Sequence, residues 1–222
     1  MLNDILKRKC EQLISDAGKT ISEKRKALLN DLASSLKKEI ALKEQNGDSV
    51  AVVYLCTHNS RRSHFAQVWG HIASVYFKVS NLKTYSGGTV ATACHPNTIA
   101  ALKQIGFDIK CDDLSCENPL YHVYYNDEEF IECYSKANTD ESLPQKDFIA
   151  VMTCSDSDIN CPLVPGAKKR FSTTYDDPKE FDETQNPLPN YVERSLQIAT
   201  EILYTFQELT EFVEDSPVHI IR

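Results

Sequence analysis

The chain has 222 residues, enough for one domain with additions or for two small domains, and its 41% apolar content argues against a disordered protein. Its 24 Lys and Arg against 32 Asp and Glu give a net charge of −8, which argues against a general nucleic-acid binder. No stretch approaches the roughly 20 apolar residues of a membrane helix, and the N-terminus lacks the apolar region of a signal peptide. We therefore expect a cytoplasmic protein, in which eight reduced cysteines indicate chemistry, a metal or plain packing instead of a disulfide framework.

Residues 1–48 are predicted to form an N-terminal helical extension. Leu and Ile recur at three- and four-residue spacing from Ile21 to Leu42, which is typical of an amphipathic helix, and a shorter helix precedes it up to about Gly18. The pattern predicts a helical hairpin packed on the main domain, and dimerisation or partner binding through these helices is the alternative. On the first interpretation, deletion of residues 1–45 should preserve the chemistry.

Strands and helices alternate in the predicted catalytic domain, residues 49–215. Continuous apolar runs at 50–55 and 148–152 predict buried strands, and further strands are expected at 82–86 and 169–172. Helices are predicted at about 62–76, 97–105 and 192–213. This alternation predicts an α/β doubly wound fold with a parallel four-stranded sheet. The polar segment 112–146 is predicted to be an insertion near the site, with a hairpin that pairs residues 122–125 with 130–134.

The first predicted strand runs directly into Cys56-Thr-His-Asn-Ser-Arg-Arg62-Ser63, and a helix follows. Such a loop turns backbone amides inward and binds anions, so the predicted anion-binding residues are Thr57, His58, Asn59, Ser60, Arg61, Arg62 and Ser63. A thiol in this field should have its pKa lowered to about 3.5–7.5, which makes Cys56 the predicted nucleophile. Arg62 is expected to hold a tetrahedral oxyanion by a two-pronged hydrogen bond, and Ser63 to donate to the thiolate. Asn59 is expected to brace the loop through its side chain.

This loop resembles that of the low-molecular-weight protein tyrosine phosphatase superfamily, and within it the thioredoxin-coupled arsenate reductases. The resemblance covers about residues 50–110 and 147–206 and includes Tyr85-Ser-Gly-Gly-Thr89. The loop departs from the family at His58, where Gly is usual, and at Arg61, where Cys is frequent. Because His tolerates a left-handed backbone better than most residues, we expect the loop to keep its shape.

Asp177 is the predicted general acid. It lies in Tyr175-Asp-Asp-Pro178, just after the last predicted strand, and the resembled family supplies this acid from an Asp-Pro pair. Asp176 is the weaker candidate, and Asp-Pro alone is also a common turn. Phosphatases that act on phosphotyrosine carry tyrosines just after this pair, whereas Lys179-Glu-Phe181 follows here, which weakens the phosphotyrosine interpretation.

Cys154 and Cys161 follow the strand predicted at 148–152, with six residues between them. Zinc sites usually have closer cysteines and a second ligand pair, so no metal is predicted, while a purely structural role is the alternative. The resemblance implies that these two cysteines shuttle a disulfide from Cys56 to thioredoxin as electron donor, with no bound cofactor. The residues between them are poor helix formers and are expected to loop out. The five remaining cysteines are interpreted as packing or incidental thiols: Cys10, Cys94, Cys111, Cys116 and Cys133.

The predicted function is therefore the reduction of arsenate to arsenite through an intramolecular disulfide cascade. The alternatives are phosphomonoester hydrolysis and a non-catalytic, anion-binding regulatory module. The expected partners are an arsenate or phosphate oxyanion, thioredoxin and, through the N-terminal helices, a second copy of the chain. Neither nucleic acid nor a membrane is expected.

Overall fold

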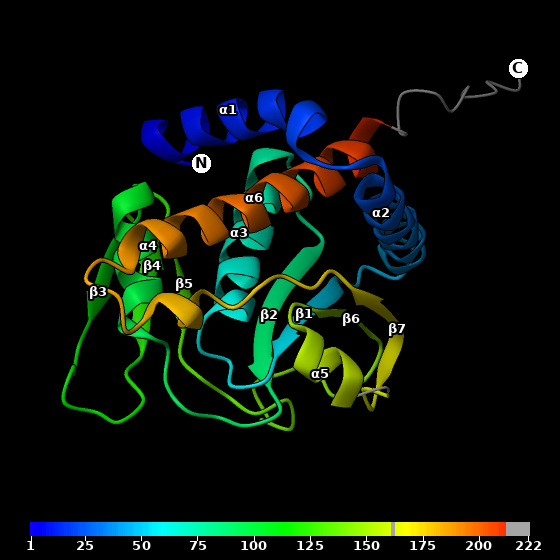
Figure 1. Cartoon of the computed structure of the whole chain (residues 1–222). Helices are drawn as coiled ribbons and strands as arrows, with labels where there is room; N and C mark the ends of the chain where they lie inside the picture. The colour runs from blue at the N-terminus through cyan, green and yellow to red at the C-terminus, as the bar shows by residue number, and fades with distance from the viewer. Residues whose placement is uncertain (161–162, 212–222) are drawn as a thin grey trace, which may run out of the picture.

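The main sheet consists of four parallel strands in the order β2-β1-β6-β7 (Figure 1). The computed structural model describes residues 1–160 and 163–211. The four strands are β1 (Val50–Cys56), β2 (Leu82–Gly88), β6 (Phe148–Met152) and β7 (Ala167–Ser172). The central strands β1 and β6 carry continuous apolar runs because the sheet is covered on both faces there. The predicted α/β fold with a parallel four-stranded sheet is confirmed.

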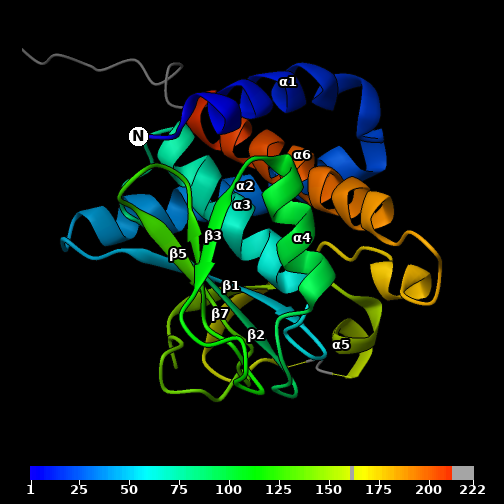
Figure 2. The same ribbon diagram turned by 90° about the vertical axis from the view of Figure 1, so that its left-hand side faces the viewer.

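The long helices cover one face of the sheet (Figures 1 and 2). The larger hydrophobic core lies between that face and these helices. From β1 it takes Val50, Val52 and Tyr54, whereas Val53 and Leu55 belong to a smaller core on the opposite face, as the alternation of side chains in a strand requires. The helices packed on the larger core include α3 (Arg62–Tyr76), α4 (Pro96–Ile105) and α6 (Leu188–Glu211). The strand order reverses beside β1, and ligands of open α/β sheets bind at such a point.

The N-terminal helices are α1 (Asp4–Thr20) and α2 (Glu23–Glu44). Each begins at a polar cap, because Asn3 accepts from the Leu6 amide and Ser22 from the Arg25 amide. Both helices pack on α6, and their apolar side chains share the core of β1 and α3. These shared side chains are Leu6, Cys10, Leu13, Leu32, Ala33 and Leu36.

The insertion forms part of a second, antiparallel sheet of order β3-β4-β5. Its strands are β3 (Asp108–Cys111), β4 (Tyr121–Tyr124) and β5 (Phe130–Cys133). Tyr124 pairs with Phe130, so the predicted hairpin is confirmed. The sequence did not predict β3, which pairs with β4 along its whole length.

Two short helices complete the described chain: α5 (Ser155–Asn160) and the 3-10 helix η1 (Pro178–Phe181). The poor helix formers of residues 155–160 nevertheless form a helix in this structure, and their looping out during turnover stays a prediction. Asp156 and Asp158 lie in the first turn of α5, where acidic side chains are favoured, and Arg170 of β7 donates to both the carbonyl and the carboxylate of Asp158. These contacts outweigh the poor helix propensity of the segment.

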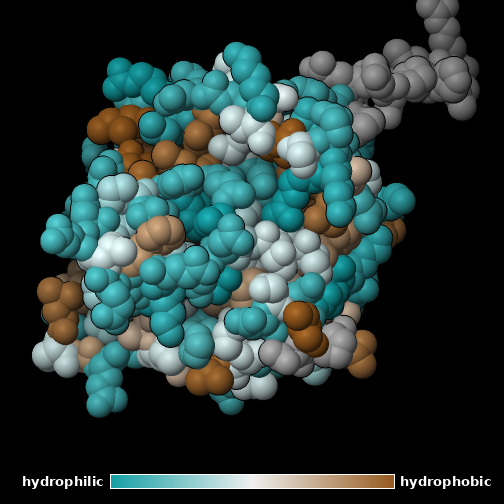
Figure 3. All heavy atoms as spheres, viewed as in Figure 1, coloured by the Kyte–Doolittle hydropathy of each residue, from teal (hydrophilic) through white to brown (hydrophobic). Residues whose placement is uncertain are grey.

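Hydrophilic residues predominate on the face shown in Figure 3. None of the helices in the described ranges is both long enough and apolar enough to cross a membrane.

Candidate active site

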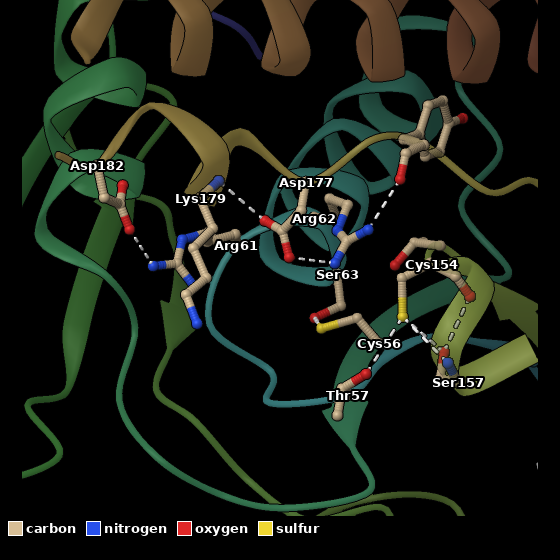
Figure 4. Close-up of polar contacts among 12 residues, drawn as sticks. Cys56, Thr57, Arg61, Arg62, Ser63, Cys154, Ser157, Asp177, Lys179 and Asp182 are labelled. Carbon is tan, nitrogen blue, oxygen red and sulfur yellow. Dashed lines mark hydrogen bonds and ion pairs between the residues drawn. The ribbon is translucent and has the colours of Figure 1, made fainter. Parts of the chain in front are cut away.

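The Cys56 sulfur lies at the carboxyl end of β1, directly before the loop that leads into α3 (Figure 4). Cys56 is buried, and its Sγ is 3.0 Å from Ser63 Oγ. The same Ser63 oxygen accepts a hydrogen bond from Asn59 Nδ2 at 2.9 Å. The Ser63 hydroxyl can therefore donate its own proton to the Cys56 sulfur, and a hydrogen bond in that direction favours a thiolate.

The loop turns its carbonyl groups outward. Three of its carbonyl oxygens each accept two hydrogen bonds, at 2.9–3.1 Å, from groups outside the loop. These pairs run from Val90 N and Thr89 Oγ1 to Thr57 O, from Thr92 Oγ1 and Ser135 Oγ to His58 O, and from His95 N and Thr98 Oγ1 to Ser60 O. In a trans peptide the N–H points opposite to the C=O, so the amides that follow these carbonyls face the other way, as in an anion-binding concavity.

The left-handed backbone of the loop falls on Asn59, with φ 44°, one position after the His58 where it was expected. Asn is among the residues that adopt this conformation most readily. The Asn59 side chain is fully buried, and its Oδ1 accepts from the Lys136 amide at 2.8 Å. Gly88 of β2 lies so close that a Cβ there would be 2.7 Å from Asn59 N. The loop therefore keeps its shape through Asn59, while His58 is exposed.

Arg62, the first residue of α3, reaches over to the segment before η1. Its Nη1 donates to Tyr175 O at 2.8 Å, and its Nη2 pairs with the Asp177 carboxylate. The Nε atom is buried and has no hydrogen-bond partner among the described residues, so this guanidinium keeps an unused donor. The predicted cation and the predicted acid thus meet beside the Cys56 loop (Figure 4).

A cavity of about 130 Å³ lies between this loop and the Asp177 segment. It is lined by Cys56, Thr57, His58, Ser60, Arg61, Arg62, Asp156, Asp177 and Lys179. Asp156 and Lys179 were not predicted as site residues. Their only sequence signal was a charged side chain two positions after a predicted site residue, Cys154 or Asp177. A larger cavity of about 830 Å³, between α3, β2 and β5, contains none of the predicted site residues.

The side chains of the two candidate acids, Asp177 and Asp176, point to different places. Asp177 lines the cavity and caps η1 by accepting from the Lys179 amide at 3.1 Å. Asp176 is 85% exposed and pairs with Arg194 at 3.3 Å, away from the cavity. Of the two, only Asp177 is in position to protonate a group bound near Cys56.

Cys154 lies just beyond the end of β6, the strand beside β1, and is completely buried. Its sulfur is 3.5 Å from Thr57 Oγ1 and 2.9 Å from Ser157 Oγ, and it accepts from the Ser157 amide at 3.4 Å. The second thiol therefore contacts the loop that carries the first (Figure 4). Cys161, the third proposed redox cysteine, lies outside the described residues.

Arg61 lines the cavity, but protein groups already bind its guanidinium. Its Nη2 is 2.6 Å from Asp182 Oδ2, and its Nε donates to the Tyr191 hydroxyl at 2.6 Å. The predicted role of Arg61 in anion binding stays a prediction, and in this structure Asp182 and Tyr191 bind its guanidinium.

The thiols interpreted as bystanders include three that are buried. Burial raises the pKa of Cys10 and of Cys133 to about 12, and raises the pKa of Cys94 well above its ordinary value. These thiols therefore stay protonated at neutral pH and pack as small apolar side chains. Within residues 1–160 and 163–211, no group of three His, Cys, Asp or Glu side chains is arranged to hold a metal ion.

Comparison with known proteins finds curated arsenate reductases among the relatives, although no family model matches the chain. An arsenate reductase from Staphylococcus aureus (strain N315) is 30% identical over 141 residues, which cover 62% of this chain and 87% of the relative. Arsenate reductase 2 from Staphylococcus epidermidis is 26% identical over 153 residues, or 66% of this chain and 95% of the relative. Among solved structures, an arginine phosphatase from Geobacillus stearothermophilus covers 77% of this chain and 99% of its own, at 18% identity and a TM-score of 0.47.

A parallel four-stranded sheet with a cysteine–arginine loop at the end of β1 has the groups that nucleophilic catalysis on an oxyanion requires. With the relation to the arsenate reductases, the chain belongs to the low-molecular-weight protein tyrosine phosphatase superfamily and is an enzyme of that family. The predicted family is confirmed, and the alternative of a non-catalytic module is set aside.

Proposed function

We propose that this enzyme reduces arsenate to arsenite, with Cys56 as the nucleophile and Cys154 as the second thiol. The observation that carries the proposal is the buried Cys154 sulfur, hydrogen-bonded to Thr57 at the end of the neighbouring strand. Hydrolysis of a phosphomonoester needs one thiol, whereas a two-electron reduction needs two. The named arsenate reductases among the relatives support the same chemistry.

In the first step the Cys56 thiolate attacks the arsenic atom of an arsenate held by the loop amides and Arg62. A bond forms between Cys56 Sγ and arsenic, and one arsenate oxygen leaves as water with a proton from Asp177. For this step Asp177 must release Arg62, because the two are paired before the anion binds. The anion that takes the guanidinium therefore frees the acid.

In the second step the Cys154 thiolate attacks Cys56 Sγ. The sulfur–arsenic bond breaks, and its electron pair stays on arsenic, which leaves as arsenite. The two electrons come from the two thiols, which end as a Cys56–Cys154 disulfide. Thr57 Oγ1 and the Ser157 amide and hydroxyl lie within hydrogen-bond distance of the Cys154 sulfur and would stabilise its thiolate.

In the third step Cys161 attacks Cys154 Sγ and Cys56 leaves as a thiolate, so the disulfide moves to Cys154–Cys161. A dithiol protein such as thioredoxin then reduces it by thiol–disulfide exchange, which restores both thiols. Such a donor is the partner that the cascade requires, and the chain itself needs no bound cofactor for it.

The cavity lining favours a small inorganic oxyanion over phosphotyrosine. Among the described residues that line it there is no Phe, Tyr or Trp side chain, and Lys179 follows the Asp-Pro pair. A phosphotyrosine ring would have no apolar wall to stack on. Phosphomonoester hydrolysis is the second candidate, because Cys56, Arg62 and Asp177 line one cavity and suffice for that reaction.

A pair of assays separates the two candidates. The reduced protein is incubated with arsenate, thioredoxin, its reductase and NADPH, and separately with p-nitrophenyl phosphate. We expect NADPH consumption that depends on arsenate. Cys154→Ser should abolish this consumption, whereas Cys116→Ser, which removes an exposed thiol, should leave it unchanged. Absence of arsenate turnover together with full phosphatase activity of Cys154→Ser would overturn the reductase proposal. Retention of both activities by Cys56→Ser would overturn the site itself.

A further inference from the structure

Two consecutive arginines hold the two ends of one short segment. Arg62 pairs with Asp177, directly before η1, and Arg61 pairs with Asp182, directly after it. The segment of residues 177–182 is thus fixed across the mouth of the Cys56 loop at both ends (Figure 4). Only the Arg62 end belongs to the chemistry described above.

The Arg61 end is a closed triangle of hydrogen bonds with Asp182 and Tyr191. Tyr191 OH accepts from Arg61 Nε and donates to Asp182 Oδ1, both at 2.6 Å, while Arg61 Nη2 bonds to Asp182 Oδ2 at 2.6 Å. Tyr191 is fully buried at the start of α6, so the triangle is anchored to the helix core. His95 adds a ring stacked on Tyr191 at 5.6 Å.

The charges within the triangle are matched. Burial alone would raise the pKa of Asp182, but the Tyr191 hydroxyl and the Arg61 cation outweigh it and hold that pKa below its ordinary value. Asp182 is therefore ionised at neutral pH and neutralises Arg61. A cation paired in this way attracts an anion less than an unpaired one does.

The two ends differ in what happens when an oxyanion binds. The anion takes Arg62 away from Asp177 and so removes the contact that holds the acid before turnover. The Arg61–Asp182–Tyr191 triangle does not involve the anion and remains. It is then the fixed point that keeps residues 177–182 over Cys56.

We propose that Arg61, Asp182 and Tyr191 are positioning residues, which hold the general-acid segment over Cys56 while Arg62 binds the oxyanion. This inference rests on the proposed function, since it assigns Asp177 as the acid and Cys56 as the nucleophile. Arg61 stands where the family frequently has a cysteine, and this role does not require it to contact the substrate.

The first test separates anion binding from turnover. Inorganic phosphate is the probe, and its affinity is read from the protection of Cys56 against iodoacetamide, followed on the Cys56 peptide by mass spectrometry. For Arg61→Gln we expect phosphate affinity within about twofold of the parent and arsenate turnover lowered about 30- to 100-fold, because small displacements of a catalytic group carry losses of this size. Arg194→Gln is the matched control, since it breaks the exposed Asp176 pair of the same segment and should leave both readouts unchanged.

The second test is a double-mutant cycle. A merely structural role of Arg61 would not give the result expected from a positioning role. If Arg61 acts through Asp177, then Asp177→Asn combined with Arg61→Gln should be no slower than Asp177→Asn alone. Tyr191→Phe removes only the bridging hydroxyl and should lower turnover in the same direction, which keeps the test open if Arg61→Gln does not fold.

The outcomes distinguish this inference from the proposed function. A tenfold loss of phosphate affinity in Arg61→Gln, or multiplicative losses in the double variant, would overturn the positioning role alone. Full turnover in Asp177→Asn would instead overturn the assignment of the acid, and with it the proposed mechanism.

Discussion

At Cys56 the sulfur depends on a chain of side-chain contacts that leads out of the loop. Ser63 reaches the sulfur, Asn59 holds Ser63, and Asn59 Oδ1 is held by the Lys136 amide. Each partner fixes the position of the next, so the Ser63 hydroxyl stays within hydrogen-bond distance of the Cys56 sulfur. The sequence predicted the donor Ser63 and the brace Asn59 because both belong to the loop, but the Lys136 contact joins residues 77 positions apart and has no local signal.

Loss of the Ser63 hydroxyl should make Cys56 a weaker nucleophile. One hydrogen bond to a charged group contributes about 1.5–3 kcal/mol, which corresponds to roughly 10- to 150-fold in rate. For Ser63→Ala we expect the rate constant of Cys56 alkylation by iodoacetamide at neutral pH to fall by a factor in this range. Ser74→Ala, on the same helix but bonded only to the His71 carbonyl, is the control. An unchanged rate constant would show that Ser63 does not activate the nucleophile.

His64, next to Ser63 in α3, should make folding sensitive to mild acid. Burial, followed by the charge of Lys136, lowers the pKa of His64 to about 3, whereas the unfolded chain titrates near 6.5. Between these values the unfolded state binds the extra proton, so the free energy of unfolding falls as pH drops below about 6.5, by up to roughly 1.4 kcal/mol per pH unit. Urea unfolding between pH 4.5 and 7 measures this slope. A His64→Gln variant with the same slope as the parent would contradict the assignment.

At the scale of elements, the insertion supports the loop. Ser135, just after β5, donates to the His58 carbonyl at 2.9 Å and accepts from the Thr92 amide at 2.8 Å. Asn118 holds the Ser135 backbone by two further hydrogen bonds. The insertion therefore helps to turn a loop carbonyl away from the anion.

Ser135→Ala should weaken anion binding without abolishing it. The change removes one of the two donors to the His58 carbonyl, and a neutral hydrogen bond contributes about 0.5–1.5 kcal/mol, or roughly two- to tenfold in affinity. Phosphate protection of Cys56 is the measurement. Ser142→Ala, on an exposed part of the same insertion, should have no effect, and equal affinities in all three proteins would refute the bracing role.

Elements with a strong local pattern were predictable, and those built by distant contacts were not. The apolar runs of β1 and β6 show buried strands directly, whereas β3 has four residues with only alternate burial and exists through its pairing with β4. The helix α5 contradicts its local propensity because Arg170 binds Asp158. The pairing of Arg61 with Asp182 spans 121 positions, so the sequence suggested an anion ligand where the fold has an ion pair.

At the scale of the whole molecule, the N-terminal helices complete the core. Leu6 and Leu36 are essentially inaccessible, in one cluster with β1 and α6. Arg25 of α2 bonds to Glu201 at 2.9 Å and to the Thr174 carbonyl at 3.3 Å, three residues before Asp177. Removal of these helices would expose apolar side chains of α6 and take Arg25 away from Glu201. The sequence-based expectation that deletion of residues 1–45 preserves the chemistry is therefore revised.

The truncated protein should lose its cooperative unfolding transition. As a milder probe, Leu36→Ala should lower the free energy of unfolding by about 2–5 kcal/mol, since it opens a cavity in the core. Leu42→Ala, on the exposed part of the same helix, should change it by less than about 0.5 kcal/mol. A truncated protein with parental stability would show that the helices are an independent appendage.

The most direct test of the account is the disulfide left after one turnover. Reduced Cys161→Ser protein, freed of reductant, is mixed with one equivalent of arsenate, and its disulfides are mapped by mass spectrometry while arsenite is quantified. We expect one Cys56–Cys154 disulfide and one arsenite per chain, with neither in Cys154→Ser. Arsenite formed without that disulfide, or no arsenite from a protein that hydrolyses p-nitrophenyl phosphate, would contradict it.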